Sequence, residues 1–491
     1  MPDTSTRRHR LFILCICCMS ILMVSMDVTI VNVALPSLQH SLHTSIRGAQ
    51  WAIDAYTLVL ASLLLLSGST ADRIGRRKVF QIGLVIFSIG SLLCSLASTI
   101  VWLVLCRIVQ AIGGSMLNPV ALSIVDNTFR DPEERAHAVG IWSGVVGISM
   151  AAGPIVGGAL VTSIGWRSIF WVNVPIGLVA LTLTTLFIPE SKALKSRRVD
   201  PVGQILVIGF LTSLLYGIIE ASQKGWGSPL IIGCFVAGIV LFVGLIAYEK
   251  RRFEPLINMR FFRSAPFSGA TIIAVCAFVV LGGFLFLNTL YLQDVRGFSA
   301  IRAGVYLLPM AATMMIAGPV SGTIVGRRGP RLSLNVGGLA FTAAAVMLAI
   351  SGSRVSDLVL FLGYALIGAG LGSANAAIAN TALSGMPRSQ AGVAAATTST
   401  SRQVGSSLGV AVIGSILALH ATKVAPGPAF VSDFRIAWWI ISGFGFALLI
   451  TANVTTGAWA RGTAERFNKE IEQEDQQLFN TQPSAVINRT K

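Results

Sequence analysis

The chain has 491 residues, of which 54% are hydrophobic and only 12% are charged, and its mean hydropathy is +0.74. A soluble domain carries about 25% charged residues, so this composition indicates a protein that crosses a membrane many times. It excludes a soluble enzyme, a disulfide-stapled secreted domain and a disordered chain. The formal net charge of +16 would suggest a nucleic-acid partner for a soluble protein. Here we expect none, because the basic residues follow the membrane topology.

A membrane-spanning helix needs roughly 20 consecutive apolar residues, and the sequence contains about fourteen runs of that length. An all-α membrane protein with 14 transmembrane helices is therefore predicted. In chain order, the runs lie near 11–36, 50–69, 79–98, 101–125, 138–163, 168–188, 202–221, 229–248, 266–292, 302–324, 333–352, 357–380, 391–418 and 434–458.

The distribution of Lys and Arg predicts the orientation of these spans. With the N-terminus inside, basic residues concentrate in the inside loops, as at 73–78, and are scarce outside. Cytoplasmic loops carry this excess, so we expect both termini in the cytoplasm of a bacterium and a multi-pass protein of its inner membrane. Residues 1–10 are then a cytoplasmic N-terminus, and the polar stretch 459–491 is a cytoplasmic tail.

A basic turn occurs twice with the same spacing of Gly, Arg, Gly and Arg, at 68–77 and at 322–331. Each copy follows the second span of a predicted group of six. This repeat predicts two related six-helix halves, 11–188 and 266–458, separated by a linker with two extra spans, 189–265. Parallel halves around a central site are a transporter architecture. A chance similarity between two basic turns is the alternative.

Four stretches carry a family resemblance. The turn that starts at Gly68 resembles the loop 2–3 signature of the major facilitator superfamily. The segments 27–36, 107–114 and 153–158 resemble first-, fourth- and fifth-span motifs of its drug:proton antiporters. Ser149 stands where the fifth-span motif usually has a glycine. With fourteen spans, the chain is identified as a member of the 14-span branch.

This resemblance implies a major facilitator fold and export of lipophilic, typically cationic drugs, dyes or biocides, hence antibiotic resistance. The driving force would be the proton gradient, with no cofactor. We expect small-molecule substrates, protons and the lipid bilayer as partners, and a monomer.

Two acidic residues are candidate proton carriers. Asp27 lies roughly 24 Å along the first predicted helix, and a carboxylate inside a membrane is a functional candidate by default. Its alternative role is a structural hydrogen-bond node. Asp54 lies near the outer end of the second span, where it could face the same cavity as Asp27. The alternative is a solvated interfacial residue beside Trp51 and Tyr56.

Arg107 lies within the fourth span, and a buried guanidinium must be paired or hydrogen-bonded. By resemblance, Arg107 takes part in proton coupling, and the alternative is a structural bond to backbone carbonyls. Gln110 follows at i+3 on a neighbouring face. Arg402 is a second intramembrane cation, which could pair with a carboxylate or face the cavity. An arginine that faces the substrate would disfavour cationic drugs.

The basic turn is expected to latch the cytoplasmic helix ends in one state of the transport cycle, and its alternative role is a topology anchor. Its residues are Gly68, Asp72, Arg73, Gly75, Arg76 and Arg77. The fifth-span motif is expected to form a tight contact between the halves, and its alternative role is ordinary helix packing. Its residues are Gly153, Pro154, Gly157 and Gly158.

The expected substrate cavity takes polar and aromatic residues from several spans: Asp27, Asn32, Trp51, Asp54, Tyr56, Gln110 and Arg402. Glu220, near the outer end of an extra span, is predicted to be an interfacial residue. The seven cysteines lie in apolar runs, so we expect neither disulfides nor a metal site.

The chain contains no G-x-x-x-x-G-K-[ST] motif for ATP and no hydrolase motif of the HExxH or GxSxG type, so we expect no enzyme. Three functions remain. The first is a proton-coupled multidrug exporter, and the second is a dedicated exporter of one metabolite, such as an amino acid, a peptide or a siderophore. The third is a sensor or scaffold without transport, which the intramembrane charges disfavour.

Overall fold

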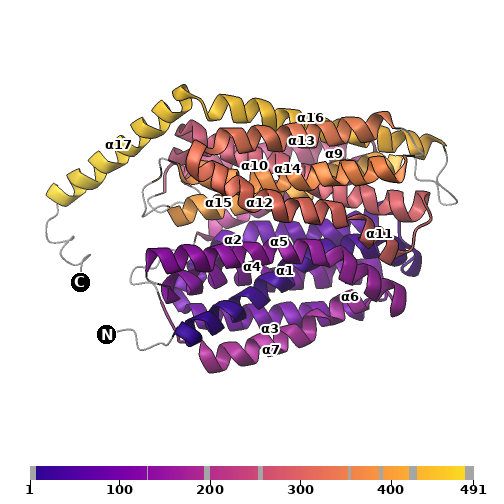
Figure 1. Ribbon diagram of the computed structural model, residues 1–491, viewed down its shortest axis with the longest axis horizontal. Coiled ribbons are helices and arrows are strands. Elements are labelled where there is room, and N and C mark those ends of the chain that lie inside the picture. Colours follow the sequence, from indigo (N-terminus) through magenta and orange to yellow (C-terminus); the bar gives the residue numbers. More distant parts are fainter. Residues whose placement is uncertain are drawn as a thin grey trace.

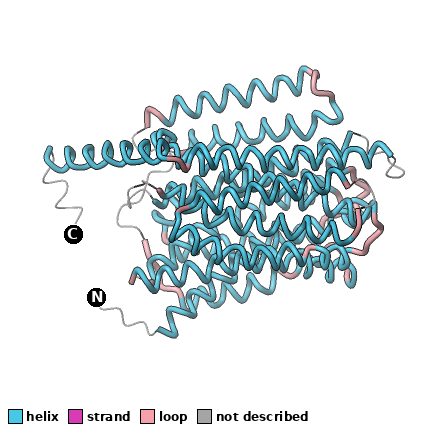
Figure 2. Tube along the Cα trace, turned by 45° about the horizontal axis from the view of Figure 1, so that its top comes forward, coloured by secondary structure: helices cyan, strands magenta, loops and turns pink. Residues whose placement is uncertain are grey.

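A computed structural model describes residues 7–129, 131–192, 200–252, 258–351, 355–384, 386, 391–419 and 428–481. These residues form helices and short loops without a strand (Figure 2). The long helices run roughly parallel in one bundle, and both chain ends lie at the same end of it (Figure 1). We call this end the terminal end and the opposite one the distal end.

The N-terminal half begins with long helices that are fixed by polar N-caps. Ser45 accepts a hydrogen bond from Gly48 N, and Thr99 accepts one from Trp102 N, which satisfies a backbone donor at each helix start. The helices of this half are α1 (Arg7–Ser41), α2 (Ile46–Ile74), α3 (Arg76–Ser95), α4 (Ile100–Thr128), α5 (Pro132–Ser163), α6 (Ser168–Trp171) and α7 (Asn173–Phe187).

Two further helices follow, α8 (Pro201–Lys224) and α9 (Pro229–Glu249), and they pack on each other as a hairpin. A short 3-10 helix, η1 (Met259–Arg263), leads into the C-terminal half. The helices of that half are α10 (Ala265–Leu290), the π-helical η2 (Tyr291–Val295), α11 (Ala300–Tyr306), α12 (Leu308–Arg328), α13 (Pro330–Ile350), α14 (Asp357–Leu383), α15 (Ala391–Leu419) and α16 (Pro428–Thr455).

The last helix, α17 (Ala458–Thr481), extends beyond the bundle at the terminal end (Figure 1). By length and hydropathy, 13 helical stretches of the described residues can each cross a membrane. α15, with 29 residues packed against α10, α2 and α8, is the fourteenth. The prediction of an all-α protein with two six-helix halves and two inserted helices is therefore confirmed.

The two halves contact each other on the distal side. Gln293 Nε2 of η2 donates a hydrogen bond of 2.8 Å to the carbonyl of Val33 in α1. Gly158 of α5 lies so close to α11 that a Cβ on it would be 2.6 Å from the carbonyl oxygen of Ala300. Such close approach of two backbones needs a glycine. The distal end is thus closed.

On the terminal side the two halves are less closely packed at α5 and α12, and we call this region the opening. A Cβ added to Gly140 or Gly144 of α5, or to Gly318 or Gly322 of α12, would meet no heavy atom within 4 Å. In α10, Phe278 is partly exposed, whereas the next residues, 279–292, are all buried. The burial of α10 therefore changes near the middle of the bundle, where we place the inner end of the opening.

Candidate functional site: a buried charge network and the interface between the halves

Asp27 of α1 and Arg107 of α4 form an ion pair inside the N-terminal half. Arg107 Nη1 lies 2.5 Å from Asp27 Oδ2, and the two side chains are 1% and 0% exposed. Removing one partner of a buried pair leaves an uncompensated charge, which costs about 3–5 kcal/mol. The pair therefore holds α1 and α4 together while both groups are charged.

Two amide side chains complete the coordination of Asp27. Gln110 Nε2 and Asn173 Nδ2 donate to Asp27 Oδ1 at 2.8 and 3.1 Å. Asn173 also donates to Ser91 Oγ of α3 at 3.1 Å. Sequence analysis identified Gln110 but not Asn173 or Ser91. The available signal was a polar residue, Asn173, at the start of an apolar helix.

Arg107 has further partners in α2. Its Nε donates to the carbonyl of Ala52 at 3.1 Å, and its guanidinium carbon lies 3.9 Å from the centre of the Tyr56 ring. Both interpretations of Arg107 thus have a counterpart in the structure, since it binds a carboxylate and a backbone carbonyl. We call Asp27, Arg107, Gln110, Asn173 and Ser91 the charge network; all its members belong to the N-terminal half.

Asp54 lies on another face of α2, at the interface with α15. It is completely buried, and Ser407 Oγ of α15 donates to its Oδ1 at 2.7 Å. Its Oδ2 has no hydrogen-bond partner, and no basic side chain pairs with it, among the residues that the structure describes. The interpretation of Asp54 as a solvated interfacial residue is therefore wrong, because the C-terminal half covers it.

One helical turn away, Gln50 reinforces the same interface. Its Nε2 donates to the carbonyls of Val410 and Ala411 at 3.2 Å each, and Gly414 leaves room for its side chain. Two polar residues of α2 thus bind α15 directly, across the boundary between the halves.

The remaining cavity candidates lie apart from the charge network. Trp51 faces α8, where its Nε1 donates to Glu220 Oε1 at 3.2 Å. Glu220 also pairs with Arg47 at 3.0 Å and is only 7% exposed. It lies near the end of α8, where it was predicted to be an interfacial residue, but α2 covers its side chain. Asn32 is buried and donates to the carbonyl of Val28 in its own helix.

The sequence of this chain is similar to those of known proteins. The model of the Major Facilitator Superfamily matches residues 17–410. The Tetracenomycin C resistance and export protein of Streptomyces glaucescens is 38% identical over 413 residues, which cover 83% of this chain and 76% of that protein. The chain belongs to the major facilitator superfamily.

Other relatives of this superfamily member have similar names. The Multidrug resistance protein Stp of Mycobacterium tuberculosis (strain ATCC 25618 / H37Rv) is 35% identical over 421 residues, covering 84% of this chain and 78% of that protein. A solved bacterial homolog of the human lysosomal transporter Spinster, in an inward-facing and unoccupied conformation, shares the fold with a TM-score of 0.61 at 18% identity, over 95% of this chain and 99% of that one.

The basic turn of the superfamily signature lies at the terminal end. Gly75 has a φ of +130°, and a Cβ there would lie 2.6 Å from Glu190 Oε1. The same carboxylate accepts a hydrogen bond from Arg77 N at 3.1 Å. Asp72 pairs with Arg76 at 3.0 Å, so its partner lies within the turn itself. Sequence analysis missed Glu190, whose only signal was an acid just after a span.

The fifth-span motif, which lies in α5, contacts two different helices. A Cβ on Gly153 would lie 2.0 Å from Thr29 Oγ1 of α1, and a Cβ on Gly157 would lie 2.6 Å from Ile30 Cγ1 of the same helix. Gly158 lies against Ala300 of α11, as described above, and a Cβ on Gly304 would lie 2.3 Å from the Pro154 carbonyl oxygen. The motif thus packs against α1 of its own half and against α11 of the C-terminal half.

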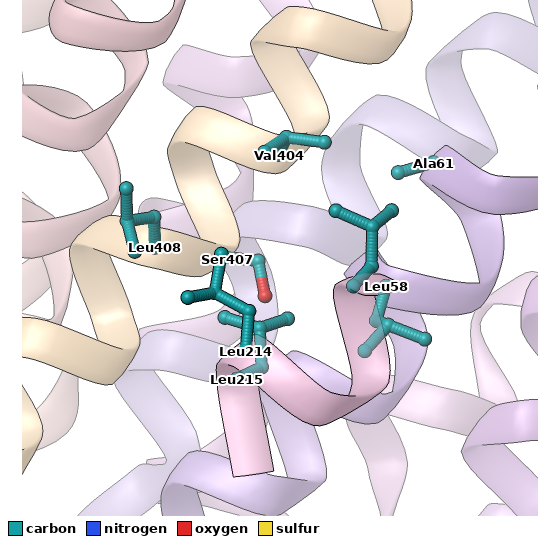
Figure 3. A pocket seen from close by; sticks show the side chains of 8 residues that line it. Leu58, Ala61, Leu214, Leu215, Val404, Ser407 and Leu408 are labelled. Atoms are coloured by element: carbon teal, nitrogen blue, oxygen red, sulfur yellow. The ribbon is translucent and has the colours of Figure 1, made fainter. Parts of the chain in front are cut away.

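A small pocket lies beside Asp54, where α2, α8 and α15 meet (Figure 3). Ser407, the partner of Asp54, is its one polar lining residue. The lining residues are Leu58, Ala61, Leu211, Leu214, Leu215, Val404, Ser407 and Leu408. In the described part of the chain, no group of three or more His, Cys, Asp or Glu residues forms a metal site.

Proposed function

We propose that this protein exports lipophilic, drug-like molecules from a bacterial cell in exchange for protons, by alternating access and as a monomer. The names of its relatives, which include resistance and export proteins, support drug export. The terminal end would face the cytoplasm, since the basic turn with Arg73, Arg76 and Arg77 lies there. The opening would then admit substrate from the cytoplasm or the inner leaflet.

The observation that carries the proton coupling is the hydrogen bond between Ser407 and Asp54. Burying an ionised carboxylate without a cation costs several kcal/mol, and among the described residues Asp54 has one hydroxyl donor and no cationic partner. The neutral acid is the form that this closed interface accommodates. Loss of the proton would require water at Asp54, and separation of α2 from α15 would admit it.

Asp27 would have a different role. Its charge is compensated by Arg107 in the present state, so the pair tolerates burial without a proton. Protonation of Asp27 would remove the attraction and release Arg107 from α1. We infer that the charge network senses protons within the N-terminal half, whereas Asp54 couples its proton to the contact between the halves.

The resulting cycle has two access states. In the state described here, with Asp54 protonated, the distal end is closed and substrate enters from the terminal side. Protonation of Asp54 and the bound substrate would favour opposite states, and this opposition is the linkage that an antiporter requires. The latch role of the basic turn belongs to the other state, in which the terminal ends approach each other.

A second candidate, a dedicated exporter of one compound, is favoured by the names of some relatives. The Tetracenomycin C protein and the Methylenomycin A resistance protein of Bacillus subtilis (strain 168), 31% identical over 91% of this chain and 92% of that protein, are each named for one compound. A panel of unrelated lipophilic drugs separates the candidates, because a polyspecific cavity transports several of them.

The decisive experiment measures proton-driven drug uptake into inverted vesicles that contain the wild-type protein, Asp54→Asn or Asp27→Asn. Asp126→Asn is the matched control, because Asp126 is an exposed carboxylate paired with Arg135 outside the network. We expect Asp54→Asn to lose proton-driven uptake and to keep drug binding. Uptake by Asp54→Asn at the wild-type rate would exclude this carboxylate as the coupled proton carrier.

A further inference from the structure

Arg402 is a second arginine at the middle of the membrane-spanning bundle. From Ala391 at the terminal end, α15 rises about 16 Å to reach it, which is about half of a hydrocarbon core roughly 30 Å thick. At that depth an arginine is costly unless it faces water or a partner.

The contacts of Arg402 differ from those of Arg107. Its Nη2 makes one long hydrogen bond of 3.4 Å, to the carbonyl of Asn375 in α14, and its Nε is buried without a hydrogen-bond partner. Within the described part of the chain, no carboxylate pairs with it. The Phe278 ring of α10 lies 5.7 Å from its guanidinium carbon. Arg402 therefore lacks the counter-charge that Asp27 gives Arg107.

Arg402, Asn375 and Phe278 lie where the opening between the halves ends. All three are partly exposed. Buried residues follow each of them toward the distal end: 371–374 in α14, 279–292 in α10 and, after the partly exposed 403 and 404, 405–407 in α15. The Oδ1 atom of Asn375 is also buried without a hydrogen-bond partner in the described structure. Three helices thus present a cation, an amide and an aromatic ring at the inner end of the opening.

The two candidate proton carriers are engaged elsewhere. Asp27 is bound to Arg107, and Asp54 accepts from Ser407, which lies five residues beyond Arg402 in α15, or about 7.5 Å of helix rise. An arginine stays protonated in proteins, so the positive charge of Arg402 persists in this state. A molecule that enters the opening could therefore supply the counter-charge that the described residues do not give Arg402.

We propose that Arg402 binds an acidic oxygen of the exported molecule, a carboxylate or phenolate carried by a lipophilic aromatic framework. The planar guanidinium can bind such oxygens with two parallel hydrogen bonds. The Phe278 ring adds an apolar surface for the framework, and Asn375 adds a hydrogen-bonding amide. This assignment rests on the proposed export function and replaces the expected preference for cationic drugs.

Binding to the detergent-solubilised protein tests the assignment directly. The probes are fluorescein, an anionic dye with a carboxylate and a phenolate, and a cationic rhodamine ester with the same xanthene core. We expect Arg402→Gln to weaken fluorescein binding by about tenfold or more, because a charge-assisted hydrogen bond is lost, and to leave rhodamine binding unchanged or tighter. Arg402→Lys should retain part of the fluorescein affinity.

Arg302→Gln is the control for the change in charge, because Arg302 is exposed near the distal end and its guanidinium lies over the rings of Phe298 and Tyr306. It should bind both dyes as the wild type does. Equal loss of both dyes in Arg402→Gln, in a variant that still elutes as a folded monomer, would show a structural role instead. Failure of the wild type to bind fluorescein would also overturn the proposal.

Transport in proteoliposomes separates this proposal from the export function. Dye retained inside is measured after lysis at one fixed pH, with protein-free liposomes as the baseline. Proton-driven uptake of rhodamine that Arg402→Gln and the wild type share, without any uptake of fluorescein, would leave export intact and reject the anionic substrate. Fluorescein binding through Arg402 without proton-driven uptake of either dye would support the anion site and reject proton-driven export.

Discussion

Glu220 of the inserted helix α8 lies 3.0 Å from Arg47 of α2, so the extra hairpin is bound to the N-terminal half by an ion pair. Trp51 Nε1 donates to the same carboxylate at 3.2 Å. Toward the terminal end, Gln204 of α8 donates to the carbonyl of Ser62 in α2 at 2.6 Å. Directional bonds at two levels therefore fix α8 to α2.

Replacement of Glu220 by Gln should loosen this attachment. The side chain is largely buried, and loss of its hydrogen bonds to Arg47 and Trp51 should reduce stability by about 1–3 kcal/mol. Thermal unfolding in detergent, followed by tryptophan fluorescence, measures the effect. Lys224→Gln is the control, because Lys224 is exposed and lies 3.5 Å from the same carboxylate. Equal shifts in both variants would contradict the assignment.

Arg107→Gln should destabilise the protein more than the double variant Asp27→Asn/Arg107→Gln. The single change leaves Asp27 buried without its cation, at a cost of about 3–5 kcal/mol, whereas the double change removes both charges. The free energy of unfolding of the wild type, both single variants and the double variant completes the cycle. Additive losses would show that the two residues do not interact.

Gly158→Ala should disfavour the closed distal end. The new Cβ would lie 2.6 Å from the backbone oxygen of Ala300, and backbone cannot move aside as a flexible side chain does. We expect a population shift toward the state with an open distal end, measured as an increased distance between spin labels at Ser41 and Leu358. Gly140→Ala is the matched control, because a Cβ there meets nothing within 4 Å. A distance distribution identical to that of the wild type would count against the backbone contact as a closure device.

The same spin-label pair tests the role of Asp54. Raising the pH removes the proton from a carboxylic acid, and the ionised form is not accommodated at the α2–α15 interface. The distal end should therefore open as the pH rises, and Asp54→Asn should stay closed at every pH. Asp357→Asn serves as the control, since Asp357 is an exposed partner of Arg296. If Asp54→Asn opened with pH as the wild type does, the titrating group would lie elsewhere.

Hydropathy and charge predicted the number of spans and the order of the two halves, because the bilayer imposes helix length and apolar composition on each span separately. They also identified Asp27, Arg107 and Gln110, since a polar side chain within an apolar run is visible locally. The hydrogen-bond partners of the buried polar residues were harder to predict from the sequence. Ser407 lies 353 residues from Asp54 in the chain, and helical periodicity contains no information about which distant helix a face will meet.

The burial of two acids was not predicted from the sequence, for the same reason in each case. Glu220 and Asp54 each lie near the end of a predicted span beside aromatic residues, which is typical of solvated membrane-interface positions. Burial of both depends on packing between α2 and a helix far along the chain, α8 or α15. Sequence patterns describe one helix at a time, whereas burial is a property of the assembled bundle.

The hairpin of α8 and α9 also has a consequence for the lipids. Between α8, α2 and α15 lies an apolar cluster, in which Leu211 and Leu215 of α8 pack with Leu58 of α2 and Ala411 of α15. Apolar contacts of this kind are not directional, so they would allow α15 to slide along α8 if the halves rock. Acyl chains would then be excluded from the line along which the halves separate. The extra helices would cover the α2–α15 interface and keep lipid hydrocarbon away from Asp54 throughout the transport cycle.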